Sequence, residues 1–291
     1  MKYAYYPGCS QETVSKEYNQ SAWAVCNELG IELLEISDWN CCGASSGHST
    51  DYWASHALAG RNIAIAEREG MDIAVVCPAC FLRLKDTQHE FRTETKFKEQ
   101  LTELIDMPYE AKYEVRHLLD IICNTVGIEK VKGKVKKPLT GLRVVAYYGC
   151  YLVRPPEITG LDDPENPQII ERLLEALGAE VLDWRAKVDC CGGSLSLARR
   201  DVVKKLVNGI CDAAHEVGAE AIVTGCGVCD ANLEARQAKG KPLPILYFTE
   251  LAGLAFGLDA RPWLKKHLLS PLNLLGKHGL LDLAKHNSNQ Y

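Results

Sequence analysis

The chain carries one cysteine pattern twice, and this repeat constrains its fold more than any other feature. Of its 13 cysteines, 10 belong to the pattern. Each copy has a single cysteine, then an adjacent pair, then a Cys-x-x-Cys motif. The gap from the pair to the motif is 34 residues in both copies, and the gaps before the pair are 31 and 39 residues. The members are Cys9, Cys41, Cys42, Cys77 and Cys80 in the first copy, and Cys150, Cys190, Cys191, Cys226 and Cys229 in the second.

The repeat extends beyond the cysteines. Residues 3–9 resemble residues 145–150, with one residue deleted from the second copy. Residues 70–77 resemble residues 218–226, again one residue out of step. Two copies of about 140 residues indicate an internal duplication that yields a pseudo-symmetric pair of domains.

We place the first domain at 1–138 and the second at 139–291. The first ends in a basic linker at 129–138, punctuated by glycine and proline. It also contains residues 92–126, which read as a helical insertion without an equivalent of similar length in the second copy. The second domain ends in an apolar, basic arm at 261–275. The insertion and the arm are candidate partner surfaces, and the arm could equally cap the second domain's own core.

Strand and helix signals alternate within each copy. This order favours an α/β fold with two Rossmann-like βαβ domains and parallel strands. Because sites in such sheets gather where strands end and helices begin, the three cysteine segments of each copy can converge. The expected strands are 3–6, 31–36 and 73–76 in the first copy and 144–148, 180–184 and 221–224 in the second, and the expected helices are 14–29, 52–69, 167–177 and 196–217.

The cysteine pattern indicates metal binding. Thiolates are soft ligands that select zinc, copper(I) or iron–sulfur clusters. Five cysteines per copy are one more than a four-ligand site needs. Two adjacent thiolates chelate a single tetrahedral ion with difficulty, but they can bind two irons of one cluster. The pattern therefore favours a four-iron cluster in each copy that is not a plain cube.

Two other interpretations of the pattern stay open. Two zinc sites of four cysteines would leave one spare cysteine per copy. A vicinal dithiol could instead exchange with the Cys-x-x-Cys motif, although that chemistry needs only two or three cysteines. The cysteines outside the pattern have no partner in the other copy and are expected to be small buried hydrophobes. They are Cys26, Cys123 and Cys211.

Composition narrows the function classes. The chain has 291 residues, a net charge of −5 and a pI near 5.9, so it lacks the basic footprint of nucleic-acid binding. The N-terminus lacks the apolar core of a signal peptide, and no apolar run is long enough for a membrane span. We therefore expect a cytoplasmic protein, whose cysteines are not structural disulfides.

The pattern, with glycine directly after each adjacent pair at Gly43 and Gly192, resembles the duplicated CCG cysteine-rich domain. The whole chain is similar to the family of catalytic, B-type subunits of the heterodisulfide reductases of methanogens. The same superfamily includes subunits of thiol:fumarate reductase, of an unusual type of succinate dehydrogenase and of glycolate and lactate oxidases. An electron-transfer subunit of one of these complexes is the alternative function.

The resemblance implies one noncubane [4Fe-4S] cluster in each copy, held by the five cysteines of that copy. It further implies an oxidoreductase that cleaves the mixed disulfide of coenzyme M and coenzyme B in a cavity between the domains, as part of the energy metabolism of methanogenesis. Electrons would come singly from an iron–sulfur subunit and, through it, from a flavin-containing subunit.

Such a disulfide carries anionic groups, so cations are expected close to the clusters. His48 follows the first cysteine pair, Lys187 precedes the second, and Arg154 follows Cys150. Arg83 and Arg199 are further candidates. The glycine-rich segments 43–47 and 192–194 could offer backbone N–H groups to an anion or to a cluster sulfide.

Overall fold

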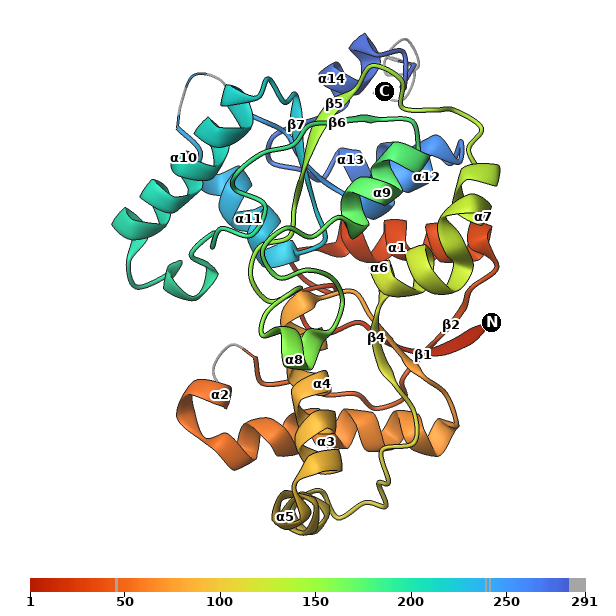
Figure 1. Ribbon diagram of the computed structural model, residues 1–291, viewed down its shortest axis with the longest axis vertical. Helices are drawn as coiled ribbons and strands as arrows, with labels where there is room; N and C mark the ends of the chain where they lie inside the picture. The colour runs from red at the N-terminus through yellow and green to blue at the C-terminus, as the bar shows by residue number, and fades with distance from the viewer. Residues whose placement is uncertain (45–46, 239, 241, 283–291) are drawn as a thin grey trace, which may run out of the picture.

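The computed structural model describes residues 1–44, 47–238, 240 and 242–282. Each half of the chain forms a four-stranded parallel sheet, and the two halves follow one another along the long axis of the molecule (Figure 1). The strand orders are equivalent, β2-β1-β3-β4 and β6-β5-β7-β8, so the prediction of a duplicated, pseudo-symmetric α/β fold is confirmed. The strands are β1 (Lys2–Tyr6), β2 (Glu32–Glu35), β3 (Ile73–Val75), β4 (Val115–His117), β5 (Arg143–Tyr147), β6 (Glu180–Val181), β7 (Ala221–Thr224) and β8 (Ile245–Tyr247).

The predicted helices form within a few residues of their expected bounds, because the sequence carries their end signals. Gly30 ends α1 in the left-handed conformation, and Asp51 begins α3 by accepting a hydrogen bond from the N–H of Ala54 at 2.7 Å. The first half contains α1 (Lys16–Leu29), α2 (Gly47–Thr50), α3 (Tyr52–Glu69), α4 (Pro78–Thr93), α5 (Thr95–Ile105), α6 (Leu118–Asp120), the π-helical η1 (Ile121–Gly127) and α7 (Ile128–Gly133). The second contains α8 (Pro156–Thr159), α9 (Ile169–Ala176), the 3₁₀ turn η2 (Gly193–Leu195), α10 (Arg200–Glu216), α11 (Gly227–Arg236), α12 (Phe248–Ala255), α13 (Arg261–Leu264) and α14 (Leu272–Lys277).

Alternate strand residues enter different cores, since successive side chains of a strand point to opposite faces. Tyr5 belongs to a large core that both halves share, whereas Tyr6 belongs to an outer core under α3 and α4. In the second half, Ala146 lies in the shared core and Tyr147 in an outer core with α10 and α11. The shared core therefore fills the space between the two sheets.

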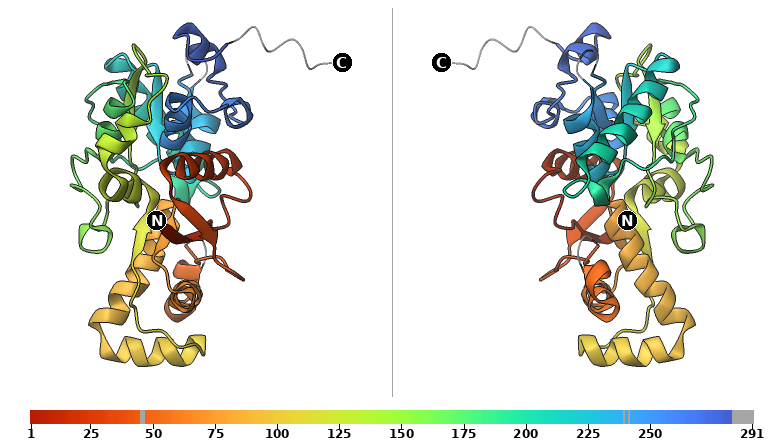
Figure 2. Two further views of the ribbon diagram at one scale, coloured as in Figure 1. Left: turned by 90° about the vertical axis from the view of Figure 1, so that its right-hand side faces the viewer. Right: turned by 90° about the vertical axis from the view of Figure 1, so that its left-hand side faces the viewer.

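Helices in the shared core pack across the boundary between the halves. Helix α1 of the first half lies against α12 and α13 of the second, and α9 of the second half lies against α6 and α7 of the first (Figures 1 and 2). Tyr18 stacks on Tyr247 with ring centroids 4.2 Å apart, and Ser21 shares a 2.7 Å hydrogen bond with Thr249. Each half thus covers its inner sheet face partly with a helix that contacts the other half.

The helical prediction for 92–126 is wrong in part. Strand β4 forms the sheet edge beside β3, and it has a counterpart in β8, which pairs with β7 in the same register. Both strands are three residues long, too short for an alternating pattern to reveal them. Only part of the predicted insertion, which includes α5, remains without an equivalent element in the described second half.

The predicted alignment before the first cysteine of each copy is also wrong. Tyr6 pairs with Val75, and Tyr147 pairs with Thr224, each two residues before a Cys-x-x-Cys motif. Tyr6 therefore corresponds to Tyr147, and no residue is deleted between this position and the cysteine that follows. The consecutive tyrosines of both copies had suggested a shifted register.

The predicted linker is partly helical, since its first residues belong to α7. Its lysines bind the first half: Lys134 and Lys136 form ion pairs with Glu28 at 3.5 and 3.2 Å. The backbone N–H groups of Lys136 and Lys137 both donate to the carbonyl of Ala255 at 2.9 Å. The division after Pro138 separates the two sheets, and its status as a domain boundary stays a prediction.

The C-terminal arm caps the second half within the described residues. Trp263 and Leu264 of α13 and Leu275 of α14 are buried in the shared core. Leu268, between them, is 71% exposed. Most of the arm's apolar surface is therefore used inside the chain.

Candidate metal centres

The cysteines gather at the carboxyl ends of the central strands. Cys9 follows β1, and Cys77 follows β3 as the residue before α4. The strand order reverses between β1 and β3, and such a switch point leaves a crevice where ligands bind in open α/β sheets. The second half repeats this arrangement with Cys150 after β5 and Cys226 after β7.

In the first half, the adjacent thiols hydrogen-bond to each other, and each also approaches a different further thiol. The Sγ atom of Cys41 lies 3.9 Å from Sγ of Cys9, whereas Sγ of Cys42 lies 3.3 Å from Sγ of Cys80. Cys77 and Cys80 flank the first turn of α4 and hydrogen-bond to each other. Cys9 is exposed, and Cys42, Cys77 and Cys80 are buried.

The second half has a similar arrangement. Cys190 hydrogen-bonds to Cys150, and Sγ of Cys191 lies 3.5 Å from Sγ of Cys229. All thirteen cysteines are free thiols, and the measured separations far exceed the roughly 2.05 Å of a disulfide. Each centre is therefore an unlinked group of thiols on three chain segments.

The divergence of the adjacent thiols matters for metal chemistry. Two sulfurs on one tetrahedral metal, each about 2.3 Å from it, lie roughly 3.8 Å apart, similar to the separation of Cys9 and Cys41. Cys42 belongs to a second group with Cys80. Such a donor set suits a centre with at least two metal positions and fits an iron–sulfur cluster better than a single zinc ion.

Hydrogen bonding within each centre favours the thiolate form of some cysteines and the thiol form of their partners. Hydrogen bonds from Cys41 and Cys80 hold the pKa of Cys42 well below its ordinary value. The Cys150 thiol, together with the backbone N–H of Gly192, lowers the pKa of Cys190 to about 6. The same hydrogen bonds, together with burial, raise the pKa of Cys41, Cys80, Cys150 and Cys229. A metal needs deprotonated cysteines, so its binding would release protons from these four thiols.

Glycines bring the backbone close to the sulfurs. A Cβ atom on Gly8 would lie 2.8 Å from Sγ of Cys80, and one on Gly149 would lie 3.0 Å from Sγ of Cys229. Both glycines also have positive φ angles, +72° and +65°. The N–H of Gly192 donates to Sγ of Cys190 at 3.3 Å. The glycine positions are thus required by the packing of the sulfurs.

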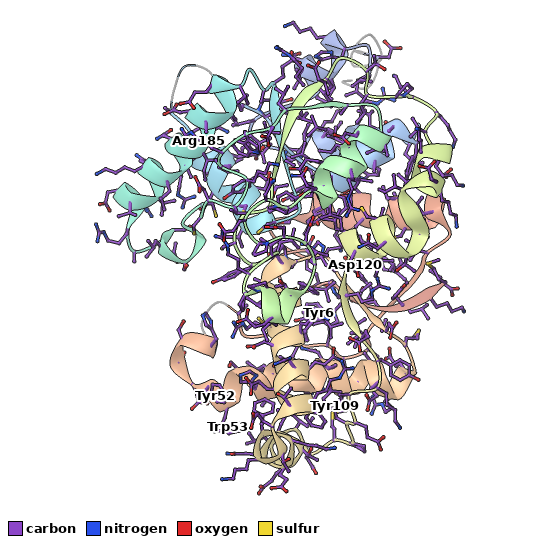
Figure 3. All side chains as sticks on the ribbon, in the orientation of Figure 1. Tyr6, Tyr52, Trp53, Tyr109, Asp120 and Arg185 are labelled. Carbon is purple, nitrogen blue, oxygen red and sulfur yellow. The ribbon has the colours of Figure 1, made fainter. Side chains whose placement is uncertain are left out.

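Two tyrosines support the loops that carry the adjacent pairs. The hydroxyl of Tyr6, labelled in Figure 3, donates to the carbonyl of Asn40 at 2.8 Å, and that of Tyr147 donates to the carbonyl of Asp189 at 2.6 Å. Each acceptor directly precedes a cysteine pair. Sequence reasoning did not assign these tyrosines a role, although both stand three residues before the first cysteine of their copy, Cys9 or Cys150.

A cavity of about 620 Å³ lies beside the second centre and receives residues from both halves. Arg83 of α4 and Arg154 line it together with Cys150 and Tyr151. The guanidinium of Arg154 also forms a 2.8 Å ion pair with Glu165. The structure therefore brings two of the candidate cations, one from each half, to one cavity that contains a cysteine of the pattern.

The other candidate cations lie elsewhere. His48 is exposed on α2, and Lys187 is buried with its ammonium 3.1 Å from Glu171 and 3.0 Å from Asp183. Neither lines the cavity beside Cys150 as the described residues define it. Arg199 pairs with Asp201 at 3.0 Å on the surface. A binding role for His48 or Lys187 stays a prediction.

The glycine-rich segments can be followed only in part. Ser45 and Ser46 of the first segment lie outside the described residues. Gly192 has a positive φ angle of +77° and precedes the short 3₁₀ turn η2 rather than a long helix. Its N–H points to cysteine sulfur, so in the second half the glycine supports the thiols directly.

The three cysteines outside the pattern are buried, as expected. Cys26 and Cys123 lie in the shared core and Cys211 in the outer core of the second half. Burial raises the pKa of each thiol to about 12. They behave as small core side chains rather than as ligands.

Sequence reasoning missed a buried polar group behind the second centre. Asp230 and Glu234 follow the second Cys-x-x-Cys on α11, and they meet His267 from the arm and Glu250 of α12. The four residues are far apart in the sequence, apart from the i, i+4 pair on α11, so no local pattern predicts their meeting.

Comparison with known proteins agrees with this geometry. A family model described as the cysteine-rich domain CCG matches residues 3–85 and 144–234, which contain both centres. The chain belongs to the CCG family. CCG domains typically bind iron–sulfur clusters, and the chain is a redox subunit of this family.

Several relatives match over most of their length. The 8-methylmenaquinol:fumarate reductase membrane anchor subunit of Wolinella succinogenes is 33% identical over 270 residues, which cover 89% of this chain and 94% of that protein. A protein of Archaeoglobus profundus described as like a heterodisulfide reductase subunit is 30% identical over 274 residues, covering 89% and 92%. The corresponding subunit of the ferredoxin:CoB-CoM heterodisulfide reductase of Methanosarcina mazei is 29% identical over 254 residues, covering 82% and 84%.

A solved structure shares the fold. The crystal structure of a hypothetical protein from Helicobacter pylori superimposes with a TM-score of 0.68 over 91% of this chain and 51% of that chain, at 10% sequence identity.

No helix among the described residues is long and apolar enough to cross a membrane. The relatives thus include subunits of two different kinds of reductase, and the resemblance to heterodisulfide reductase alone was too narrow.

Proposed function

We propose that this chain is the electron-transferring CCG subunit of a multisubunit reductase that works between a quinol and fumarate, or in the reverse direction as a succinate dehydrogenase. Each half would hold one noncubane [4Fe-4S] cluster on its five cysteines. The immediate partners would be an iron–sulfur subunit and, through it, a flavin-containing subunit. The complex would work at the cytoplasmic side of a membrane.

The observation that carries this proposal is the repeated divergence of the adjacent thiols. Cys41 approaches Cys9 and Cys42 approaches Cys80, which also contacts Cys77, so five thiols gather in one centre, one more than a tetrahedral ion binds. The pattern recurs in the second half, where Cys191 lies beside Cys229. When bound, such clusters supply reversible one-electron transfer. The similarity to the fumarate reductase subunit over 94% of its length supports this kind of complex.

The protein's own residues would stabilise a cluster without reacting themselves. Gly8 and Gly149 leave room for the sulfurs, and Gly43 and Gly192 direct N–H groups at them. Burial of Cys80 and its counterpart keeps water from part of each centre. Two residues after Cys9, the amide of Gln11 is 1% exposed, and within the described chain both its polar atoms lack a partner. An additional group beside Cys9 would satisfy them.

A second candidate function is reduction of a disulfide between coenzyme M and coenzyme B. The cavity beside Cys150 supports it, because Arg83 and Arg154 could bind the anionic groups of such a substrate. His48 and Lys187 stay weaker proposals, since the first is exposed on α2 and the second is paired with Glu171 and Asp183.

The first experiment measures iron, acid-labile sulfide and zinc on anaerobically purified protein. We expect about eight irons per chain with a similar amount of sulfide. Cys42→Ser and Cys191→Ser should each lower the iron to about four and abolish activity of the complex, while Cys26→Ala, which alters a buried cysteine outside the pattern, should retain it. About two zincs without sulfide would overturn the redox proposal.

The second experiment separates the two functions. The complex is purified through a tag on this chain and supplied either with reduced menaquinol and fumarate or with a low-potential donor and the mixed disulfide. We expect turnover with the first pair only. Turnover with the disulfide alone, lost in Arg83→Gln and Arg154→Gln variants that keep their iron, would favour the second candidate.

A further inference from the structure

The second half contains a buried acidic site built around His267. Asp230 and Glu234 come from α11, Glu250 comes from α12, and His267 follows α13. Their exposed fractions are 5%, 7%, 0% and 8%. No thiol takes part, so the site is chemically distinct from the cysteine centres.

The imidazole of His267 is held on both sides. Its Nε2 atom lies 3.0 Å from the carboxylate of Glu250. Its Nδ1 atom faces Glu234 Oε1 at 3.0 Å and Asp230 Oδ1 at 3.8 Å. One donor atom from each of Asp230, Glu234 and His267 lies within 4.8 Å of the other two.

One oxygen of the site has no hydrogen-bond partner among the described residues. Tyr247 donates to Oδ2 of Asp230 at 2.9 Å, but Oδ1, which faces His267, has no hydrogen bond in the described structure. A buried carboxylate oxygen without a donor is costly. Glu234, in contrast, also accepts from the backbone N–H groups of Leu268 and Leu269. The unpartnered atom thus points to a missing ligand.

The charges of the site lead to the same conclusion. Three carboxylates surround one imidazole, which can carry at most one positive charge. Buried Glu17 is a further acidic side chain in their vicinity. Buried carboxylates in such excess need a compensating cation or additional protons.

We propose that Asp230, Glu234 and His267 bind a divalent transition metal ion, with zinc as the best match. Oxygen and nitrogen donors about 2.0–2.2 Å from zinc lie roughly 3.4 Å apart in a tetrahedral site, between the 3.0 and 3.8 Å separations observed here. Glu250 would hold the Nε2–H of the ring, so that Nδ1 faces the metal, an arrangement common among metal-binding histidines. This proposal does not depend on the proposed function.

Among the described residues of the first half, no equivalent site is found. Counted from the Cys-x-x-Cys motifs, Phe81 corresponds to Asp230 and Lys85 corresponds to Glu234. The registers of β4 and β8 make Asp120 the counterpart of Glu250. These three residues line a cavity of about 130 Å³ (Asp120 is labelled in Figure 3). One metal ion would therefore bind per chain. It would link the C-terminal arm to α11, the helix that carries Cys229.

The test measures zinc in the full-length protein, purified anaerobically and incubated with about a tenfold excess of Zn²⁺ before desalting. We expect about one zinc per chain, with X-ray absorption showing nitrogen and oxygen neighbours at about 2.0–2.1 Å. Asp230→Asn and His267→Gln should lower the zinc content at least tenfold. Asp120→Asn, the matched change in the first half, should leave it unchanged.

Three results would overturn the proposal: no retained zinc in the wild-type protein, zinc with sulfur neighbours at about 2.3 Å, or zinc unaffected by Asp230→Asn. Asp230→Asn keeps the size of the side chain and an acceptor for Tyr247, so it tests the site even if His267→Gln fails to fold. Iron content, measured in the same samples, reports separately on the cysteine centres.

Discussion

The two cysteine centres have similar sulfur geometry but different neighbours. Three residues after each Cys-x-x-Cys motif, the second half has Asn232 and the first has Arg83. Asn232 donates to the carbonyl of Cys191 at 3.3 Å and approaches its Sγ at 3.6 Å, while Ser196 fixes the amide from the other side at 2.8 Å. Arg83 instead lines the cavity that contains Cys150 of the other half.

This difference shows which features the duplication kept and which it changed. The residues that place the sulfurs, such as Gly8 and Gly149, are equivalent in the two halves. The residues that surround the sulfurs are not. The comparison predicts two centres of the same type with different redox properties, and three experiments test it.

The largest loss of iron is expected when a methyl group fills the space beside a cysteine sulfur. Gly8→Ala and Gly149→Ala would each place a methyl group within about 3 Å of a cysteine sulfur, so each should lose most of the iron of its own half. Iron analysis and visible absorption would measure this loss. Gly30→Ala is the control, because it has a similar φ angle of +74° but no atom within 4 Å of the added methyl. Equal iron loss in all three variants would mean that backbone strain alone matters.

The second-largest effect is expected on the pH dependence of stability, through His117 of strand β4. His117 of β4 is fully buried, its Nε2 lies 3.0 Å from the carbonyl of Val76, and its Nδ1 accepts from the N–H of Leu119 at 3.2 Å. Burial lowers the pKa of His117 to about 4, whereas the unfolded chain takes up a proton near pH 6.5. Stability should therefore be greatest above pH 6.5 and fall by up to about 3 kcal/mol as the pH drops to 4.

Denaturant unfolding at a series of pH values tests this prediction. His117→Gln should remove that part of the pH dependence, although it also lowers stability at pH 7. The counterpart in the second half is Tyr247, which does not titrate in this range but donates a hydrogen bond to Asp230. The control is therefore Cys26→Ala, a buried change at a group that does not titrate between pH 4 and 6.5, and it should leave the slope unchanged. An unaltered slope in His117→Gln would contradict the assignment.

The smallest effect is expected on the reduction potentials when Asn232 or Arg83, the residues that differ between the two centres, is changed. Asn232→Ala removes a donor from the environment of Cys191 and should lower the reduction potential of the second centre by on the order of 50 mV, equivalent to about 1.2 kcal/mol for one electron. Arg83→Asn removes a positive charge from the cavity beside Cys150, so it too should lower the potential of the second centre. Redox titration followed by electron paramagnetic resonance would measure both, and a shift of the same size in both centres of either variant would argue against local control.

The sequence predicted the duplication, the parallel sheets and the convergence of the cysteines, because cysteine spacing and glycine helix ends are local signals. It did not predict β4 and β8, because both strands are short and pair with strands that are distant in the sequence. It also did not predict that the ammonium of Lys187 pairs with buried Glu171, because the two residues meet only through tertiary packing. The site around His267 depends on tertiary packing alone.

Helices of each half pack on the other half across the shared core, and this packing has a consequence for the origin of the chain. Because α1 packs on α12 while α9 packs on α6 and α7, the halves meet through equivalent surfaces related by an approximate twofold axis. A single-copy ancestor with these surfaces would have been a homodimer with an isologous interface. Fusion of the two copies made its assembly independent of protein concentration, and it freed each copy to acquire side chains that a true symmetric dimer would have been forced to carry twice.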